Sequence, residues 1–485
     1  MKKNDDRDFD LIVIGAGSGG LTVAIGGAQI GAKTLLIEKE KIGGDCTHYG
    51  CIPSKTLIKS ANKIRELKKI NENIEKDITE KINIEKILSD VSNIVSKVYS
   101  HEKPEEIKKY GIEIELGEAK FLDKKSVEVN GKTFFGKNIV IASGARARIP
   151  EVKGLNDIKF MTNKEVFNPK MFKSLAVIGA GPIGAELAQA FRAFGIEVFI
   201  IEHGKKILGR EDAEASKLVE ERFESEGIKI YKNKEIVEVL EILDNQNKCK
   251  KIVLEDTISK EKSEINCEEI LVAVGRVPNL EGLNLEKAGI DFNERGIKID
   301  SRCRTSNKNI FAIGDVASGL QFTHFANHQG KVALTNIIFK LPLKYETKVI
   351  PRVTFTEPEV ASVGEIFQTI DELVLNGDIL ILKKEYSQVD RAITDGNTKG
   401  FFKIFCDKKG FIKGAVIVGN SAGELIGEVS LAMKNNIKIT QLADTIHPYP
   451  GYGYGLRNCA DQFRSINFTL NKKKWIKKIF RLRGN

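Results

Sequence analysis

The first clear pattern along the chain is an apolar strand, a glycine turn and a helix of small residues. Residues 9–14 are almost all apolar and predict a buried parallel strand, the turn 15–20 follows directly, and the helix continues to residue 30. A second apolar strand at 33–37 ends in an acidic residue, about 20 positions after the turn. This order predicts a βαβ unit whose glycines let backbone amides approach the pyrophosphate of a dinucleotide at the helix N-terminus. The residues expected to bind it are Gly15, Gly17, Gly20 and Glu38.

The same pattern recurs further along the chain and predicts a second dinucleotide. A carboxylate at Glu202 would accept hydrogen bonds from an adenosine ribose and repel a 2′-phosphate, which favours NADH over NADPH. Lys205 and Lys206 follow closely and keep NADPH open. The expected elements are a strand at 175–178, a turn at 179–184, a helix at 185–194 and a strand at 197–201. The candidate binding residues are Gly179, Gly181, Gly184 and Glu202.

Two other segments carry a structural signal. Residues 305–315 predict a strand that ends in Gly-Asp, and an aspartate placed there can hydrogen-bond a ribityl hydroxyl. This context favours a flavin site over an ordinary strand-to-turn pair. Residues 56–110 are rich in Lys, Glu and Ile at helical spacing. They predict a long helical excursion with a solvated face.

Cys46 and Cys51 are five residues apart and enter a predicted helix. The pair can close a small disulfide ring, and a helix N-terminus lowers the pKa of a thiol because it favours the thiolate. The thiolate is the attacking species in disulfide exchange, so the pair suits redox chemistry. The alternative is a buried or zinc-binding pair, but zinc sites usually use CxxC spacing with a second ligand pair, which this sequence lacks. We therefore predict a redox disulfide and no bound metal.

The composition is that of a large globular protein. The 485 residues suggest about three domains, and 41% hydrophobic with 29% charged residues allow a sizeable core. No apolar run reaches the roughly 18 residues of a membrane-spanning helix, and the acidic N-terminus does not resemble a signal peptide. We therefore expect a cytoplasmic protein. The net charge of +10 comes from lysines spread along the whole chain, which argues against nucleic-acid binding.

Together these motifs resemble the flavin-dependent pyridine nucleotide–disulfide oxidoreductases, the family of dihydrolipoamide dehydrogenase, glutathione reductase and mercuric reductase. The resemblance runs from about residue 8 to about residue 465 and includes segments 273–279 and 354–364. It implies an α/β fold with two Rossmann-like domains, one for FAD and one for NAD(P)H, then a C-terminal α+β dimerisation domain, and a homodimer. The implied divisions are 1–150 with 276–350 for FAD, 151–275 for NAD(P)H, 351–470 for dimerisation, and 471–485 for a basic amphipathic tail.

The resemblance also implies roles for individual residues. It places Cys51 nearest the flavin and Cys46 toward the substrate, so that hydride passes from nicotinamide to flavin N5 and electrons reach the disulfide through Cys51. Lys55 and Glu186 match positions near the flavin, where they would form an ion pair. The remaining implied cofactor-binding positions are Gly44, Lys55, Gly144, Gly275, Gly314 and Asp315.

Segment 445–454 departs from the family pattern. Dihydrolipoamide dehydrogenases and glutathione reductases carry a His-Pro pair, and its histidine is the general base for the substrate-facing thiol of the other subunit. Here either His447 is that base, or Tyr449 stands in its place, as a tyrosine does in mercuric reductases; we favour Tyr449. A tyrosine with a pKa near 10 is a poor base at neutral pH and a better proton donor or ligand.

We therefore expect an FAD-dependent enzyme that passes electrons between NAD(P)H and an acceptor in the manner of mercuric reductase, with NADH favoured. The acceptor would be a thiol or disulfide, a metal–thiolate complex or a quinone. Two alternatives stay open: a dihydrolipoamide dehydrogenase, and a non-catalytic membrane-docked flavoprotein that senses redox state. The last residues, 480–485, hold no vicinal cysteine pair like that of mercuric reductases, and Cys459 is interpreted as a structural thiol.

The C-terminal residues 471–483 combine apolar side chains on one helical face with lysines and arginines on the other. The apolar residues of that face are Trp475, Ile476, Ile479, Phe480 and Leu482. This pattern is typical of a helix that lies in a membrane interface. It predicts either peripheral contact with the inner face of the membrane or a helix docked on the enzyme body.

Overall fold

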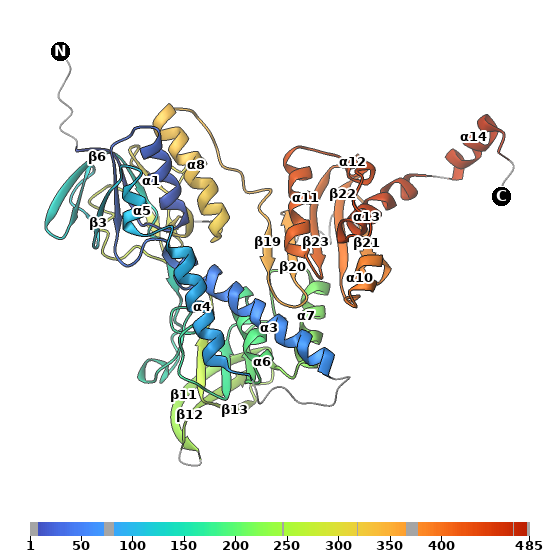
Figure 1. The fold of residues 1–485 in the computed structure, drawn as a ribbon, viewed down its shortest axis with the longest axis horizontal. Helices are drawn as coiled ribbons and strands as arrows, with labels where there is room; N and C mark the ends of the chain where they lie inside the picture. The colour runs from blue at the N-terminus through green and yellow to red at the C-terminus, as the bar shows by residue number, and fades with distance from the viewer. Residues whose placement is uncertain are drawn as a thin grey trace. The chain divides into compact units, whose positions relative to one another are not determined.

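The computed structural model of the chain falls into two compact units (Figure 1). Unit 1 lies within residues 1–203 and 228–346, and unit 2 lies within residues 204–227 and 347–485. The finer division into FAD, NAD(P)H, dimerisation and tail segments stays a prediction. The residues that the structure describes are 8–71, 82–244, 247–317, 319–364, 377–468 and 470–482.

Unit 1 contains a first parallel sheet built on the predicted βαβ unit. Strand β1 pairs in parallel with β2 and β6, β3 extends the sheet beyond β2, and β18 pairs with β6. Five of the six residues of β1 are buried, as expected for a strand covered on both faces. Helix α8 packs along α1. The bounds are β1 Phe9–Ile14, α1 Ser18–Gln29, β2 Thr34–Glu38, β3 Glu113–Leu116, β6 Lys132–Ile141, β18 Ile310–Ala312 and α8 Thr323–Phe339.

The strand predicted at 305–315 is shorter than expected. Only Ile310–Ala312 form β18, because residues 305–309 make a turn in which the Thr305 amide donates to the Ile310 carbonyl at 3.0 Å. The Gly-Asp pair then begins a short 3-10 helix, Gly314–Val316. The strand is therefore confirmed in place but not in length.

A second parallel sheet in unit 1 repeats the arrangement, in the strand order β10-β9-β8-β14. Its helix α6 begins at Pro182, three residues earlier than predicted. Proline is well suited to the first turn of a helix because the amide it lacks has no partner there. The bounds are β8 Ser174–Ile178, α6 Pro182–Ala193, β9 Glu197–Ile201, β10 Lys229–Tyr231 and β14 Glu269–Val272.

Antiparallel elements flank and link these two sheets. An antiparallel meander, β11-β12-β13, precedes β14 in the chain, and the ribbon β7-β15 pairs the segment that leaves the first sheet with the segment that returns to it. Strands β4 and β5 extend the first sheet beyond β6. The bounds are β4 Lys120–Phe121, β5 Ser126–Val129, β7 Ala145–Ala147, β11 Lys234–Asp244, β12 Asn247–Asp256, β13 Lys262–Cys267 and β15 Arg276–Pro278.

The predicted excursion at 56–110 is helical where the structure describes it, and residues 72–81 lie outside the described part. Helix α3 has a solvated face, as predicted, and its other face packs against α6. Arg65 is buried there and donates to the Gln189 carbonyl at 2.7 Å. Helical spacing identifies an amphipathic face but not its partner. The helices are α3 Cys51–Asn71, α4 Ile84–Tyr99 and α5 Pro104–Lys108.

Unit 2 is an α+β body built on a five-stranded antiparallel sheet of order β19-β20-β23-β22-β21. Its core is rich in aromatic side chains, and the rings of Tyr386 and Phe402 stack with centroids 4.7 Å apart. The strands are β19 Arg352–Thr354, β20 Val360–Gly364, β21 Ile379–Glu385, β22 Phe401–Asp407 and β23 Ile412–Val418. The helices are α10 Asp390–Thr394, α11 Ala422–Lys434, α12 Ile439–Asp444, α13 Tyr452–Asn467 and α14 Leu470–Phe480.

Unit 2 also takes helix α7 (Ala213–Ser225) from the middle of the chain. The carboxylate of Asp212 caps this helix and forms an ion pair with Lys403 at 3.0 Å. Glu211, which is buried, pairs with Arg352 at 3.3 Å. These ion pairs attach α7 to the antiparallel sheet. Among the helices of the described residues, none is long and apolar enough to cross a membrane.

Candidate active site

The predicted disulfide between Cys46 and Cys51 is present. Cys46 lies in the short helix α2 (Gly44–His48), Cys51 is the first residue of α3, and their Cα atoms are 4.8 Å apart. The sulfur of Cys51 lies 3.5 Å from the hydroxyl of Thr323, which begins α8. The disulfide therefore lies where the N-termini of α3 and α8 meet, and both helix ends favour a thiolate.

Cys459 has no part in this arrangement. Its side chain is fully buried and its thiol donates to the Leu382 carbonyl at 3.2 Å. Burial raises the pKa of the Cys459 thiol to about 12. These contacts agree with its interpretation as a structural thiol, since reactive cysteines have accessible, low-pKa thiols.

Lys55 and Glu186 form the predicted ion pair, with 2.7 Å between Lys55 Nζ and Glu186 Oε2. Lys55 lies one helical turn beyond Cys51 on α3, and Glu186 projects from α6. The Glu186 side chain is only 5% exposed, whereas that of Lys55 is 37% exposed. The pair thus links the helix of the disulfide to the helix of the second glycine turn. Its role beside a flavin stays a prediction.

Arg276 lies between two carboxylates close to the disulfide. Its Nη1 donates to Asp45 Oδ2 at 2.9 Å, and its Nε is 3.6 Å from Asp315 Oδ2. Burial raises the pKa of Asp315, and Asp45 acts in the same direction, while the Arg276 guanidinium opposes both effects. Asp315 is the predicted ribityl ligand, and Asp45 immediately precedes Cys46. The sequence patterns alone did not mark Asp45 or Arg276.

The first glycine turn fits a dinucleotide. Gly15 has a φ of +100°, and a Cβ on Gly20 would lie closer than 3.0 Å to the Gly15 carbonyl oxygen, so both positions require glycine. By contrast, a Cβ on Gly17 would meet only the Cα of Gly44, at 4.0 Å. Glu38 Oε2 accepts from the Ala16 amide at 2.7 Å, which places this carboxylate beside the turn. The open side at Gly17 is where the pyrophosphate of FAD would approach.

The second glycine turn repeats this geometry. Gly179 has a φ of +99°, and a Cβ on Gly184 would overlap the Gly179 carbonyl oxygen, whereas a Cβ on Gly181 would meet nothing within 4 Å. Glu202 Oε2 accepts from the Ala180 amide at 2.8 Å. The turn therefore fits a second dinucleotide, and the binding of a ribose hydroxyl by Glu202 stays a prediction.

The other predicted cofactor-binding glycines have backbone angles in the left-handed region, which residues with a side chain rarely adopt. Their φ angles all lie between +66° and +113°. A Cβ on Gly44 would lie 2.8 Å from the Cα of Gly17, so the close approach of α2 to the first glycine turn requires glycine at position 44. Contact with a cofactor stays a prediction for these positions, which are Gly44, Gly144, Gly275 and Gly314.

His447 and Tyr449, in the C-terminal segment of unit 2, differ in their exposure and in their hydrogen-bond partners. The ring nitrogens of His447 are 3.0 Å from the Thr445 carbonyl oxygen and 2.8 Å from Glu428 Oε1, and its side chain is 7% exposed. Tyr449 is 66% exposed and donates its hydroxyl to Asp390 Oδ2 at 2.6 Å. That hydrogen bond raises the pKa of Tyr449.

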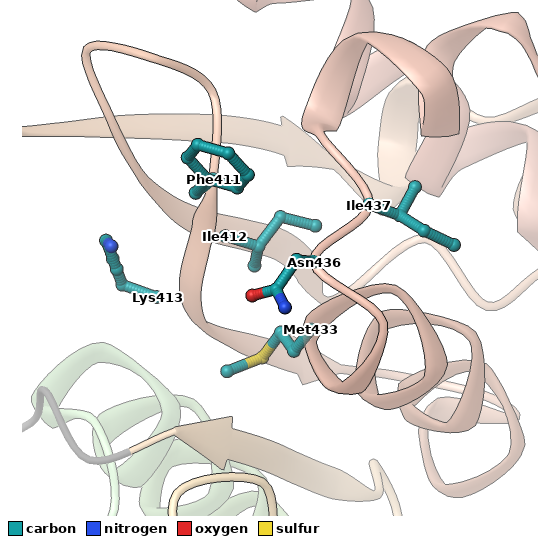
Figure 2. Close-up of a pocket in the computed structure, with 6 residues that line it drawn as sticks. All are labelled: Phe411, Ile412, Lys413, Met433, Asn436 and Ile437. Carbon is teal, nitrogen blue, oxygen red and sulfur yellow. The ribbon is translucent and has the colours of Figure 1, made fainter.

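Sequence reasoning missed the carboxylate partners of these two residues. Glu428 stands 19 residues before His447, and Asp390 stands 59 residues before Tyr449. Such pairs are made by tertiary packing, and no spacing rule indicates them. A pocket of about 310 Å³ in the same unit, between the start of β23 and the end of α11, contains none of the predicted site residues (Figure 2). Its lining residues are Phe411, Ile412, Lys413, Met433, Asn436 and Ile437.

Two family models match the chain. Residues 9–330 match the model described as pyridine nucleotide-disulphide oxidoreductase, and residues 350–457 match the dimerisation domain of the same family. The chain belongs to this family. It is therefore an FAD-dependent oxidoreductase that uses NAD(P)H, and its dimerisation domain supports a homodimer. The predicted fold class, two dinucleotide-binding domains with an α+β dimerisation domain, is confirmed.

Relatives of two kinds cover nearly the whole chain. A mercuric reductase from Lysinibacillus sphaericus is 33% identical over 464 residues, which is 95% of this chain and 83% of the relative. A dihydrolipoyl dehydrogenase from Bacillus subtilis (strain 168) is 35% identical over 464 residues, which is 92% of this chain and 94% of the relative. A copper complex of the HOCl-induced flavoprotein disulfide reductase RclA from Escherichia coli is 24% identical with a TM-score of 0.81, covering 92% of this chain and 98% of RclA, and shares the fold.

Proposed function

We propose that this chain is an NADH-dependent reductase, which delivers electrons to an acceptor that reacts at sulfur. The acceptor class is a disulfide or a metal ion carried by thiolates, and Cys46 is the sulfur that meets it. The relatives leave both directions of electron flow open, because a dihydrolipoyl dehydrogenase oxidises a dithiol whereas a reductase delivers electrons. The proposal rests on how unit 2 holds its proton-transfer groups.

The observation that carries the proposal is the pairing of His447. The Thr445 carbonyl oxygen and the Glu428 carboxylate lie within hydrogen-bond distance of its two ring nitrogens, so both nitrogens are engaged within unit 2. With both nitrogens engaged in this way, His447 is not placed to take the proton that oxidation of a dithiol releases.

Tyr449 suits the opposite direction. Its phenol is exposed, and the hydrogen bond to Asp390 raises its pKa above the ordinary value near 10, so the hydroxyl keeps its proton at neutral pH. Reduction of a disulfide acceptor releases a thiolate that must gain a proton. A tyrosine that holds its proton can donate a hydrogen bond to that thiolate, which favours reduction over dihydrolipoamide oxidation.

The residues of unit 1 would hold the cofactors for this reaction. The first glycine turn with Glu38 would hold FAD, and the second with Glu202 would hold NADH, whose ribose hydroxyls suit a carboxylate better than a 2′-phosphate does. Lys206 donates to the Glu211 carbonyl at 2.6 Å, which gives this lysine a partner within its own loop. Bound FAD supplies the two-electron link between NADH and the disulfide. When the S–S bond accepts two electrons, Cys46 and Cys51 become thiolates, and the Thr323 hydroxyl lies within reach of Cys51.

The test is steady-state turnover of NADH with lipoamide, glutathione disulfide and thiol-bound Hg(II), together with NAD⁺ reduction by dihydrolipoamide. We expect Tyr449→Phe to lower kcat/KM for a productive acceptor about 30-fold, since loss of one hydrogen bond to a charged group costs about 2 kcal/mol. His447→Ala should change it less than about threefold, and Tyr110→Phe, an exposed tyrosine of unit 1, serves as the matched control. Fast NAD⁺ reduction by dihydrolipoamide that disappears in His447→Ala would instead identify a dihydrolipoyl dehydrogenase.

We further propose that the C-terminal helix α14 contacts a membrane surface. Trp475 and Phe480 are 66% and 67% exposed, and Ile479 is also exposed, on a helix with lysines on its other face; Leu482, just after the helix, is exposed too. Exposed apolar residues opposite lysines fit the interface of an anionic bilayer. Such contact would suit a quinone acceptor as well as one carried by a membrane protein.

Sedimentation with vesicles tests this second proposal. The purified protein should sediment with phosphatidylglycerol vesicles and much less with phosphatidylcholine vesicles. Deletion of residues 471–485 should abolish sedimentation, and Trp475→Ser with Phe480→Ser should weaken it while all lysines remain. The proposal fails if the intact chain stays in the supernatant with both lipids.

A further inference from the structure

Asp45 is held by both of its carboxylate oxygens, one residue before Cys46. Oδ2 accepts from Arg276 Nη1 at 2.9 Å, and Oδ1 accepts from Asn163 Nδ2 at 2.9 Å. The same Asn163 amide also donates to the Tyr49 carbonyl at 3.2 Å, while the Tyr49 amide donates to the Asp45 carbonyl at 2.8 Å. Asp45 and Asn163 therefore fix both ends of the loop between the two cysteines.

The two partners of Asp45 come from the two segments that connect the parallel sheets of unit 1. Asn163 lies between β7 and β8, on the segment that leaves the first sheet for the second. Arg276 opens β15, on the segment that returns. Asn163 and Arg276 are both largely buried, so these are ordered contacts rather than surface pairs. The turn that bears Cys46 is thus tied to both connections at one carboxylate.

Asp45 shares its cationic partner with a second carboxylate. Arg276 is shared by Asp45 and Asp315, so one guanidinium serves two carboxylates. Lys164, another cation that acts on Asp45, is paired with Glu40 at 2.8 Å, so the group keeps an excess negative charge next to Cys46 in the chain when its carboxylates are ionised. A nearby negative charge disfavours thiolates, and its effect on a pKa is about one unit or more when the groups lie within about 4–6 Å.

We propose that Asp45 is a positioning residue that holds Cys46 in place and keeps the disulfide form of the Cys46–Cys51 pair favoured over the dithiolate. This inference rests on the proposed redox role of the pair. In the step it affects, the S–S bond breaks, two electrons from the reductant enter the sulfurs, and two thiolates form, each of which can take up a proton. Arg276 moderates the effect, since its positive charge offsets part of the repulsion.

The test measures the thiol–disulfide equilibrium of the purified holoprotein in mixtures of reduced and oxidised dithiothreitol. Cys46 and Cys51 thiols are trapped with a maleimide and counted by peptide mass spectrometry, so that the readout needs neither NADH nor turnover. We expect Asp45→Asn to raise the equilibrium constant for reduction about tenfold, which is about 30 mV. Arg276→Gln should lower it by a similar factor. General loosening of the fold cannot raise the equilibrium constant in one variant and lower it in the other.

Two further variants separate charge from geometry. Asp300→Asn removes an aspartate from another Asp–Arg pair of unit 1, at 3.0 Å from Arg304, and should leave the equilibrium within about twofold of the wild type. Asn163→Ala removes the neutral partner of Asp45 and should shift it less than Asp45→Asn does. If Asp45→Asn does not fold, Arg276→Gln still tests whether the charge at Asp45 disfavours reduction, through the predicted fall in the equilibrium constant.

The outcomes distinguish the inference from the proposed function. A pair that stays oxidised in excess dithiothreitol in the wild type overturns its redox role. A pair that is reduced normally, but with the same equilibrium constant in wild type, Asp45→Asn and Arg276→Gln, overturns the role of Asp45 alone. A shift of the same size in Asp300→Asn also overturns it, because the effect would then be nonspecific.

Discussion

Two glycines of the second turn should respond in opposite ways to the same substitution. Gly181 has ordinary backbone angles, φ −71° and ψ −179°, and a Cβ there would meet nothing within 4 Å. Gly181→Ala should therefore fold like the wild type, and a smaller entropy of the unfolded chain can add about 0.4–1 kcal/mol of stability. A Cβ on Gly184 would instead lie closer than 3.0 Å to the Gly179 carbonyl oxygen and 3.2 Å from Val177 Cγ1. Gly184→Ala should cost about 1–3 kcal/mol of folding free energy, as overpacking usually does.

Although Gly181→Ala should not lower the stability of the fold, it should weaken the binding of NADH. The methyl group of Gly181→Ala would stand in the space through which the pyrophosphate approaches the backbone amides. Loss of one hydrogen bond to a charged phosphate costs about 1.5–3 kcal/mol, so about 2 kcal/mol corresponds to a roughly 30-fold rise in Kd for NADH. Kd is measured by quenching of flavin fluorescence, and stability by thermal melting of the same samples. Gly195→Ala is not a suitable control, because Gly195 has a φ of +93° and alanine would be strained there.

Three results would refute this reasoning. If Gly181→Ala binds NADH as the wild type does, the open space beside that residue is not the path of the pyrophosphate. If Gly184→Ala melts at the wild-type temperature, the close approach of the helix to the turn is not what requires glycine there. A rise in Kd accompanied by an equal loss of stability in Gly181→Ala would also refute it, since the space would then be structural.

Three further predictions concern the redox pair and the groups around it. In an anaerobic NADH titration followed by visible absorbance, Cys46→Ser should take up two electrons fewer per flavin than the wild type. Its long-wavelength band from the Cys51 thiolate should no longer depend on added NADH, and identical titrations would remove the disulfide from the electron path. Glu186→Gln should lower the melting temperature, because it removes a charge-assisted hydrogen bond worth about 1–2 kcal/mol. The loss should be at the low end of that range because Lys55 is 37% exposed, and adding Lys55→Met should lower the stability little further. Asp390→Asn should lower the pKa of Tyr449 toward its ordinary value in an ultraviolet difference titration. The hydrogen bond of Tyr449 stabilises the fold fully below pH 10 and is lost as the pH rises through the raised pKa, so an unchanged alkaline titration in Asp390→Asn would contradict the assignment.

The parts of the site that depend on local sequence could be predicted. Both glycine turns and their acids, Glu38 and Glu202, lie within single βαβ units, where strand, turn and helix fix the geometry over a few residues. The disulfide and the Lys55–Glu186 pair followed from the family resemblance. Local order and specific motifs therefore account for the parts of the site that were predicted.

Contacts between distant segments could not be predicted in this way. Asp45 and Arg276 are 231 residues apart, and nothing in either local sequence indicates the other. Likewise, the helical spacing of α3 did not show that α6 would cover it, because amphipathic periodicity gives the direction of an apolar face and not its neighbour. The strand at 305–315 was overestimated because an apolar run shows where a strand can form, while the turn at its start depends on a backbone hydrogen bond from Thr305.

The attachment of helix α7 limits how far the halves of this enzyme can be exchanged. The chain of the nucleotide-binding half leaves unit 1 to form α7 and then returns to it, and Asp212 and Glu211 find their counterions, Lys403 and Arg352, only in the dimerisation half. A chimera that takes residues 151–275 from a relative would remove the carboxylates that pair with Lys403 and Arg352, unless the relative carries acidic residues at positions 211 and 212. A change of nicotinamide preference is therefore better sought by point substitution than by grafting a whole segment, because α7 belongs to the same compact unit as its counterions.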